Sequence, residues 1–276
     1  MLRRLICFTF SILLLLRAAP AAEAPEPVLP ILMYHDVRWE NPGKDAVTPA
    51  ELESDLRWLA SEGYTPVTMA RVADFVLEGK PLPPRPIVLS FDDGFQSAYL
   101  TVLPLLRAYG MPMVLSVIAG SADEFSAYPG EDPRRAHATW MQLRALADSG
   151  FAELQNHSYA LHHGGGGAWG CDRRPGESPA AYEARLGEDA LKAQERLLAE
   201  TGRTALVFTY PYGRWSGESE AVLRELGFRA TFTCDYGVNL LTGDPDCLFG
   251  LRRICRSHGA ELAALLAGAA AFQKER

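Results

Sequence analysis

The sequence predicts an α/β fold, a distorted (β/α) barrel of about seven parallel strands. Short apolar runs alternate with amphipathic runs along the chain, which is typical of repeated strand–helix units and a parallel sheet. The number of apolar runs, seven or eight, favours closure of that sheet into a barrel. The strands are expected at residues 28–34, 65–69, 87–91, 113–118, 151–155, 206–210, 230–234 and 251–255.

Capping signals place helices between these strands. Thr48-Pro49-Ala50-Glu51 is a capping box with proline at the first helical position, and it predicts a helix to about Ser61. Other helices are expected at 139–150, at 180–200 before Gly202, and at 218–226 before Gly227. A further helix-like stretch, 96–109, follows the third strand.

The first 22 residues have the pattern of a signal peptide. Arg3 and Arg4 precede an apolar run at 5–16, and small residues follow at 18–22. The apolar run is short for a membrane span, although an uncleaved anchor is the alternative. Residues 23–276 are then expected to form one domain that is exported to the periplasm or the cell exterior, a length that can bury a full core.

Charge and cysteine content argue against two classes of function, nucleic-acid binding and metal binding by thiolates. The chain carries 27 basic and 34 acidic residues, and loss of the first 22 residues would remove three arginines and no acid. So acidic a chain is not expected to bind nucleic acid. Four cysteines lie beyond the leader, and in an oxidising compartment they could form two disulfides by any of three pairings. Their spacing argues against a thiolate metal site. They are Cys171, Cys234, Cys247 and Cys255.

Four polar or aromatic clusters directly follow predicted strands, at residues 33–36, 92–93, 156–163 and 210–213. Because the carboxyl ends of parallel strands meet at one rim, these clusters are expected to converge. The adjacent carboxylates Asp92 and Asp93 would be costly at the end of a buried strand without a cation or a catalytic role. A simple Asp-Asp-Gly turn is the alternative.

A carboxylate from 92–93 and two histidines from 157–163 predict a two-histidine, one-carboxylate metal site. An open coordination position is typical of a catalytic metal, and the second carboxylate could then act as a general base on water. The spacing leaves open whether His162 or His163 is the second histidine ligand. Alternatively, the histidines belong to a surface loop, and His35 is a core histidine.

These residues carry a resemblance to a known family. Ser90-Phe91-Asp92-Asp93-Gly94 resembles the first motif of the polysaccharide deacetylases, carbohydrate esterase family four, which have a NodB-like domain. His157-Ser158 resembles the start of the second motif. The histidine five positions on, the segment 33–37 and the segment 210–213 are similar to the poly-β-1,6-N-acetylglucosamine deacetylases of biofilm export systems. The resemblance spans about residues 28–256 and implies a NodB-like barrel.

The resemblance implies a metal-dependent hydrolase that removes N-acetyl groups from an exported polysaccharide, with poly-β-1,6-N-acetylglucosamine as the expected substrate. Asp92 would be the general base and His35 the general acid. Asp93, His157 and His162 would hold a divalent metal, usually zinc, with cobalt or nickel as alternatives. A deacetylase of peptidoglycan or chitin fragments and a non-catalytic glycan-binding module are the competing interpretations.

The resemblance also implies residues that contact the sugar. Pro211 and Tyr212 would line the groove, with the Tyr212 backbone N–H near the oxyanion. Three aromatic residues are candidates for stacking on sugar rings or, equally, for packing: Tyr159, Trp169 and Trp215. Contact with an export machinery or a membrane surface is expected as well.

The chain departs from the family pattern in two places. Many members have an arginine shortly before the Pro-Tyr of the third motif, where it orients the base, but here Thr209 and Tyr210 precede Pro211. The partner of the base is therefore open, with Arg252 or Arg253 of the last strand as candidates. A clear Asp-Trp fourth motif is also missing.

Overall fold

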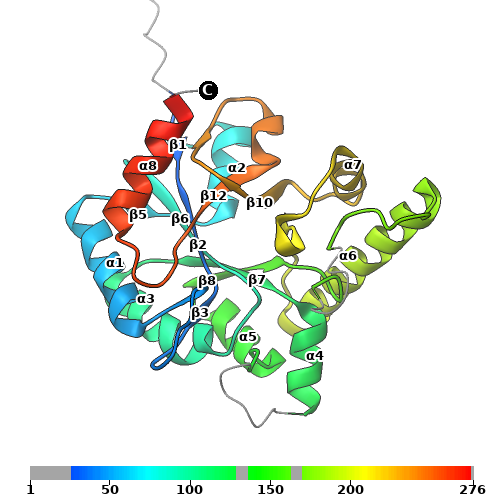
Figure 1. Cartoon of the computed structure of the whole chain (residues 1–276), viewed down its shortest axis with the longest axis horizontal. Coiled ribbons are helices and arrows are strands. Elements are labelled where there is room, and N and C mark those ends of the chain that lie inside the picture. The colour runs from blue at the N-terminus through cyan, green and yellow to red at the C-terminus, as the bar shows by residue number, and fades with distance from the viewer. Residues whose placement is uncertain (1–25, 129–135, 163–169, 275–276) are drawn as a thin grey trace, which may run out of the picture.

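The computed structural model describes residues 26–128, 136–162 and 170–274. Parallel strands close into a barrel with helices around it, and the last strand of the ring pairs with the first (Figure 1). Around the barrel the seven strands are β2 (Ile31–Tyr34), β12 (Leu251–Cys255), β10 (Ala230–Tyr236), β9 (Val207–Thr209), β8 (Ala152–Asn156), β7 (Met113–Val117) and β6 (Pro86–Phe91). The predicted fold class is confirmed.

The helices lie where the capping signals predict them. The capping box of the first helix has both of its bonds, from Thr48 N to Glu51 Oε2 at 2.8 Å and from Glu51 N to Thr48 Oγ1 at 3.2 Å. The expected helix at 96–109 begins with a π-helical turn, Ala98–Val102. The α-helices are α1 (Pro49–Ser61), α2 (Met69–Glu78), α3 (Leu103–Tyr109), α4 (Ala119–Ala127), α5 (Trp140–Asp148), α6 (Pro179–Thr201), α7 (Gly217–Glu225) and α8 (Leu262–Lys274).

Several short strands differ from the prediction. The expected strand at 28–34 divides at Pro30, which has no N–H to donate. Its first part, β1 (Val28–Leu29), pairs with β11 (Asn239–Leu240) outside the barrel. The expected strand at 65–69 is only β5 (Thr65–Pro66), which pairs with the first two residues of β6. A small pair not predicted from the sequence, β3 (Asp36–Val37) and β4 (Ala46–Val47), holds the base of a loop directly after β2.

Alternation along the strands divides the core into two layers. One set of strand residues packs outward against the helices: Leu32, Leu89, Leu115, Leu154, Phe208 and Ile254. Their neighbours pack together with α2 in a second apolar cluster: Ile31, Val88, Val114, Val207, Phe232 and Leu251. Asp92 continues the Val88 face, and Arg253 continues the Leu251 face. The two charged side chains therefore enter the barrel from its carboxyl end.

The predicted leader, residues 1–22, lies outside the described residues, so the cleavage and export predictions stay predictions. Among the described helices, none is long and apolar enough to cross a membrane. All four described cysteines carry free thiols, so neither of the two disulfides considered from the sequence is formed: Cys171, Cys234, Cys247 and Cys255.

Candidate active site

The polar clusters do converge at the carboxyl end of the barrel. A cavity of about 480 Å³ is lined by residues that follow β2, β6, β8 and β9. Its wall contains six of the predicted site residues: His35, Asp92, Asp93, His157, His162 and Tyr212. The expectation that four separate segments build one site is confirmed.

Three non-glycine residues at this rim have left-handed backbone conformations, which are uncommon and costly for such residues. They are Asp93 (φ 70°), Ser158 (φ 70°) and Tyr212 (φ 59°), and each follows a barrel strand closely. The turn at Asp93 is held by the His137 ring, whose Nδ1 lies 2.9 Å from the Asp93 carbonyl oxygen. These turns redirect the chain at the strand ends, where the cavity opens.

Asp93, His157 and His162 form a group that could hold a metal ion, with one ligand atom each and all three atoms within 4.8 Å of one another. His157 Nδ1 lies 2.8 Å from the Thr209 carbonyl oxygen, an acceptor, so Nδ1 carries the proton. In the neutral ring, Nε2 is then an acceptor, and it lies 3.3 Å from Asp93 Oδ1. The Nε2 of His162 is 3.5 Å from the same oxygen.

These acceptor atoms face one another in a buried place. Among the described residues, Asp93 Oδ1 is buried with no hydrogen-bond partner, so either a proton or a cation is needed there. The donor set of one carboxylate and two imidazoles suits a divalent transition metal. The side chains present therefore fit a metal, and the prediction of His162 over His163 as the third ligand agrees with this geometry.

The ionisation of the three groups also suits a cation. Burial alone would raise the pKa of Asp93, but contact with His157 and the charges of both histidines outweigh it and hold this pKa below its ordinary value. Burial and the nearby His157 lower the pKa of His162, which favours the neutral ring that a metal requires. At His157 burial opposes protonation, but the neighbouring aspartates raise the pKa, so a cation would compete there with a proton.

Asp92 does not share the Asp93 environment. Its Oδ1 accepts a hydrogen bond from Arg253 Nη1 at 2.7 Å, and Ser90 Oγ contacts both groups, at 3.3 Å from Asp92 and 3.0 Å from Arg253. Arg253 is 1% exposed and also donates to the Thr233 carbonyl. Burial would raise the pKa of Asp92, but the Arg253 charge outweighs it and lowers this pKa. The open choice of partner is settled as Arg253, since strand alternation points Arg252 to the opposite face.

His35 lies in the same cavity wall at the end of β2. The Asp92 backbone N–H donates to the Tyr34 carbonyl at 2.9 Å, which holds the two strand ends side by side. His35 is partly buried and lines the cavity together with Asp92 and Asp93. It is therefore a cavity histidine and not a core one.

Of the predicted sugar contacts, only Tyr212 is in the cavity wall, where its ring centroid lies 4.2 Å from that of His162. Pro211 is buried, and Trp215 is 40% exposed, but neither lines the cavity. Tyr159 packs instead: its hydroxyl donates to Asp123 at 3.1 Å and Lys192 Nζ lies 3.7 Å over its ring. These contacts occupy its hydroxyl and one ring face, and the stacking role considered for Tyr159 stays a prediction. Trp169 is outside the described residues.

Sequence reasoning missed several supporting residues. Ser90 was visible only as part of the Ser-Phe-Asp-Asp-Gly motif, and its period-two spacing from Asp92 could have placed it on the same face. The carbonyl of Thr209 orients His157, but backbone groups leave no signal in a sequence. His137 and Cys234 come from distant segments; Cys234 lines the cavity beside Arg253, with 3.9 Å between its Sγ and Arg253 Nη2.

Comparison with known families identifies the chain. The polysaccharide deacetylase family model matches residues 79–231, more than half of the sequence and the part that contains both aspartates and both histidines. The chain belongs to the polysaccharide deacetylase family. The predicted family and its enzyme class, hydrolases, are confirmed.

A curated relative of this family member carries the name of the branch inferred from the motifs. The poly-beta-1,6-N-acetyl-D-glucosamine N-deacetylase of Escherichia coli (strain K12) is 31% identical over 227 residues, covering 73% of this chain. That alignment covers only 34% of the relative, so the chain spans about a third of it.

Solved structures show the same architecture. The BpsB deacetylase domain from Bordetella bronchiseptica is 29% identical, with a TM-score of 0.67 over 83% of this chain and 97% of that one. IcaB from Ammonifex degensii is 25% identical, with a TM-score of 0.71 over 89% and 97% of the two chains. The chain therefore aligns with nearly the whole of both solved chains.

Proposed function

We propose that this polysaccharide deacetylase removes N-acetyl groups from N-acetylglucosamine residues of an exported polymer, with poly-β-1,6-N-acetylglucosamine as its substrate. The observation that carries this proposal is the meeting of Asp92, Asp93, His157, His162 and His35 in one cavity. The name of the Escherichia coli relative supports the β-1,6 linkage. The basic and apolar leader at residues 1–22 supports export to the periplasm or the cell exterior.

Asp93, His157 and His162 would hold a divalent cation, with zinc preferred for this donor set and cobalt or nickel as substitutes. Such an ion supplies Lewis acidity toward the acetamide carbonyl and toward the attacking water. Side chains of this protein would carry out the remaining steps. They would bind and orient the sugar, accept one proton from water and donate one proton to the leaving amine.

Asp92 would act as the general base. Its pKa is held low by Arg253, so it is ionised and ready to accept a proton from water. The Arg253 and Ser90 contacts both engage Oδ1 and thereby orient the carboxylate. His35 would protonate the nitrogen of the leaving amine, and acetate and a free amino sugar would separate. Tyr212, whose ring packs on His162, would border the sugar at the mouth of the cavity.

The test is acetate release from β-1,6 and β-1,4 linked N-acetylglucosamine oligomers, measured on metal-stripped protein before and after reloading with zinc, cobalt or nickel. We expect release that depends on added metal and favours the β-1,6 oligomers. Metal-dependent release from β-1,4 oligomers alone would move the substrate to chitin or peptidoglycan. Binding of both oligomers without acetate release by the reloaded protein would favour a glycan-binding module.

A further inference from the structure

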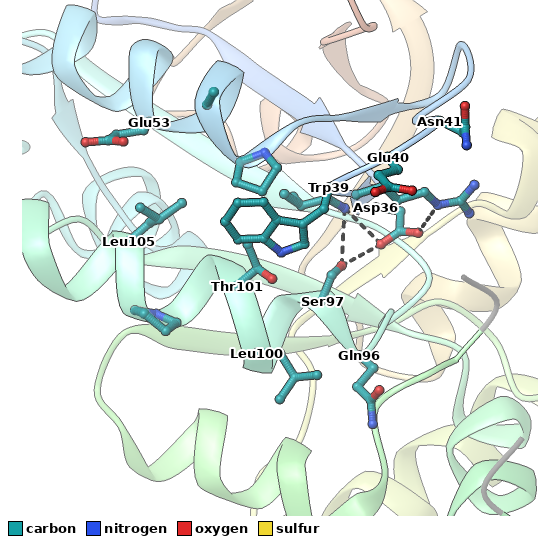
Figure 2. A pocket seen from close by; sticks show the side chains of 15 residues that line it. Asp36, Trp39, Glu40, Asn41, Glu53, Gln96, Ser97, Leu100, Thr101 and Leu105 are labelled. Atoms are coloured by element: carbon teal, nitrogen blue, oxygen red, sulfur yellow. Dashed lines mark hydrogen bonds and ion pairs between the residues drawn. The ribbon is translucent and has the colours of Figure 1, made fainter. Parts of the chain in front are cut away.

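A second and larger pocket lies beside the catalytic cavity. Its volume is about 820 Å³, within the range of about 300–1,000 Å³ for ligand sites. The loop after β3 forms one wall, and the start of α1 and the segment from η1 (Ala98–Val102) to α3 form the others. Figure 2 shows Trp39 projecting into the middle of this space, above Thr101. Trp39 is 78% exposed and Leu100 is 59% exposed.

The backbone just before Trp39 is anchored by hydrogen bonds of Asp36 and Arg38. Buried Asp36 accepts hydrogen bonds at Oδ1 from Val37 N at 2.8 Å and from Ser97 Oγ at 2.6 Å. Arg38 Nε donates to Asp36 Oδ2 at 2.5 Å, and Arg38 N donates to the Val47 carbonyl at 2.9 Å. The base of the loop is thus tied to the neighbouring strand and to η1, as Figure 2 shows for Asp36 and Ser97. The backbone that carries the exposed indole is therefore anchored at the edge of this pocket, so less of the loop has to be ordered when a ligand binds.

The two hollows share a wall. Asp36 and Arg38 line both of them, and the same loop contributes residues 39–41 to the second pocket and residues 42–45 to the catalytic cavity. A polymer whose reacting sugar lies in the catalytic cavity therefore has an adjoining surface for its next residues. Trp39 offers a face for the apolar side of a sugar ring, and Glu40 and Glu53 offer acceptors for hydroxyl groups.

We propose that this pocket, called here the Trp39 pocket, is an accessory subsite that binds sugar residues of the same glycan chain outside the catalytic cavity. The proposal rests on the proposed function for its substrate class. The proposal predicts that long oligomers bind more tightly than short ones, and that this difference in affinity depends on Trp39. Because Trp39 is largely exposed, its truncation should hardly change folding stability.

The test uses an Asp92→Asn background, in which acetate release should be about 10²- to 10⁴-fold slower, and measures binding of β-1,6 linked disaccharide and hexasaccharide by calorimetry. We expect Trp39→Ala to weaken hexasaccharide binding by about tenfold, the loss of one aromatic anchor. The disaccharide should lose much less, so the ratio of the two affinities shrinks. Met141→Ala is the matched control, since Met141 is 73% exposed on α5 and outside both hollows.

Equal hexasaccharide affinity with and without Trp39 would overturn the subsite. A hexasaccharide that binds no more tightly than the disaccharide when Trp39 is present would overturn it as well. The subsite would also be overturned if Trp39→Ala changed the sedimentation coefficient of the protein but not its affinity for either oligomer. The pocket would then be a contact between two copies of the chain. If hexasaccharide binding depends on Trp39 but the metal-reloaded wild-type protein releases no acetate, the subsite would stand and the proposed reaction would be rejected.

Discussion

Asp92→Asn is expected to lower kcat for acetate release by about 10²- to 10⁴-fold, the usual contribution of a general base. Asparagine keeps the size of the side chain and can still accept the hydrogen bond from Arg253, but it cannot take a proton from water. Asp92 is outside the Asp93, His157 and His162 group, so metal content should not change. Acetate assays and atomic spectroscopy on the same preparations measure both quantities.

Asp93→Asn is the matched control, because it is the same substitution one residue along. An amide at this position removes the negative charge that faces both histidines, so this variant should lose the metal and, with it, the turnover. The two variants should therefore differ: Asp92→Asn should lose turnover but keep the metal, and Asp93→Asn should lose both. Normal turnover by Asp92→Asn, or metal loss in that variant with retention in Asp93→Asn, would reverse or reject the assigned roles.

Arg253→Met is expected to move the acidic limb of the kcat/KM profile to higher pH and to destabilise the protein. Arg253 lowers the pKa of Asp92, so without it the buried carboxylate protonates at a higher pH and the base is lost earlier on acidification. Removing one member of a buried ion pair also costs about 3–5 kcal/mol of unfolding free energy. The pH profile and urea unfolding at pH 7 measure the two effects.

The sign of the stability effect follows from linkage. A carboxyl whose folded pKa is depressed contributes stability above its unfolded pKa, and this contribution is lost as pH falls through the folded value. The wild-type protein should therefore keep its advantage over Arg253→Met at neutral pH and lose part of it in acid. Arg252→Met is the control, on the same strand but facing away from Asp92. If Arg253→Met fails to fold, Arg253→Lys retains the charge and should show a smaller shift of the same limb. An unchanged acidic limb in a folded variant would exclude Arg253 as the partner of the base.

Much of the barrel could be predicted because local signals and the fold agree. The strands at 87–91, 113–118 and 251–255 lie within one residue of their predicted bounds, since each is a buried apolar run. The capping box at Thr48 marks its helix for a similar reason. The split at Pro30 and the short β3–β4 pair were less accessible, because they depend on pairing with distant segments and not on a local pattern.

Some residues of the candidate site could likewise be predicted from local patterns, and others could not. Asp92, Asp93, His157 and His162 could be found because they directly follow strands and match motifs of known spacing. Arg253 was only one of two candidates until the face of its strand was known. The orienting carbonyl of Thr209 and the ring of His137 act through tertiary contacts that spacing does not record. Tyr159 is an aromatic residue beside a motif whose contacts with Asp123 and Lys192 also could not be predicted from its place in the sequence.

The central claim is that Asp93, His157 and His162 together hold one divalent cation, and metal content tests it most directly. Wild-type, His162→Ala and His163→Ala proteins would be loaded with zinc, dialysed and analysed by atomic spectroscopy. We predict about one zinc per chain for the wild type and His163→Ala, and loss of zinc from His162→Ala, which lacks one of three ligands. Full zinc content in His162→Ala, or loss of zinc in His163→Ala alone, would contradict this assignment.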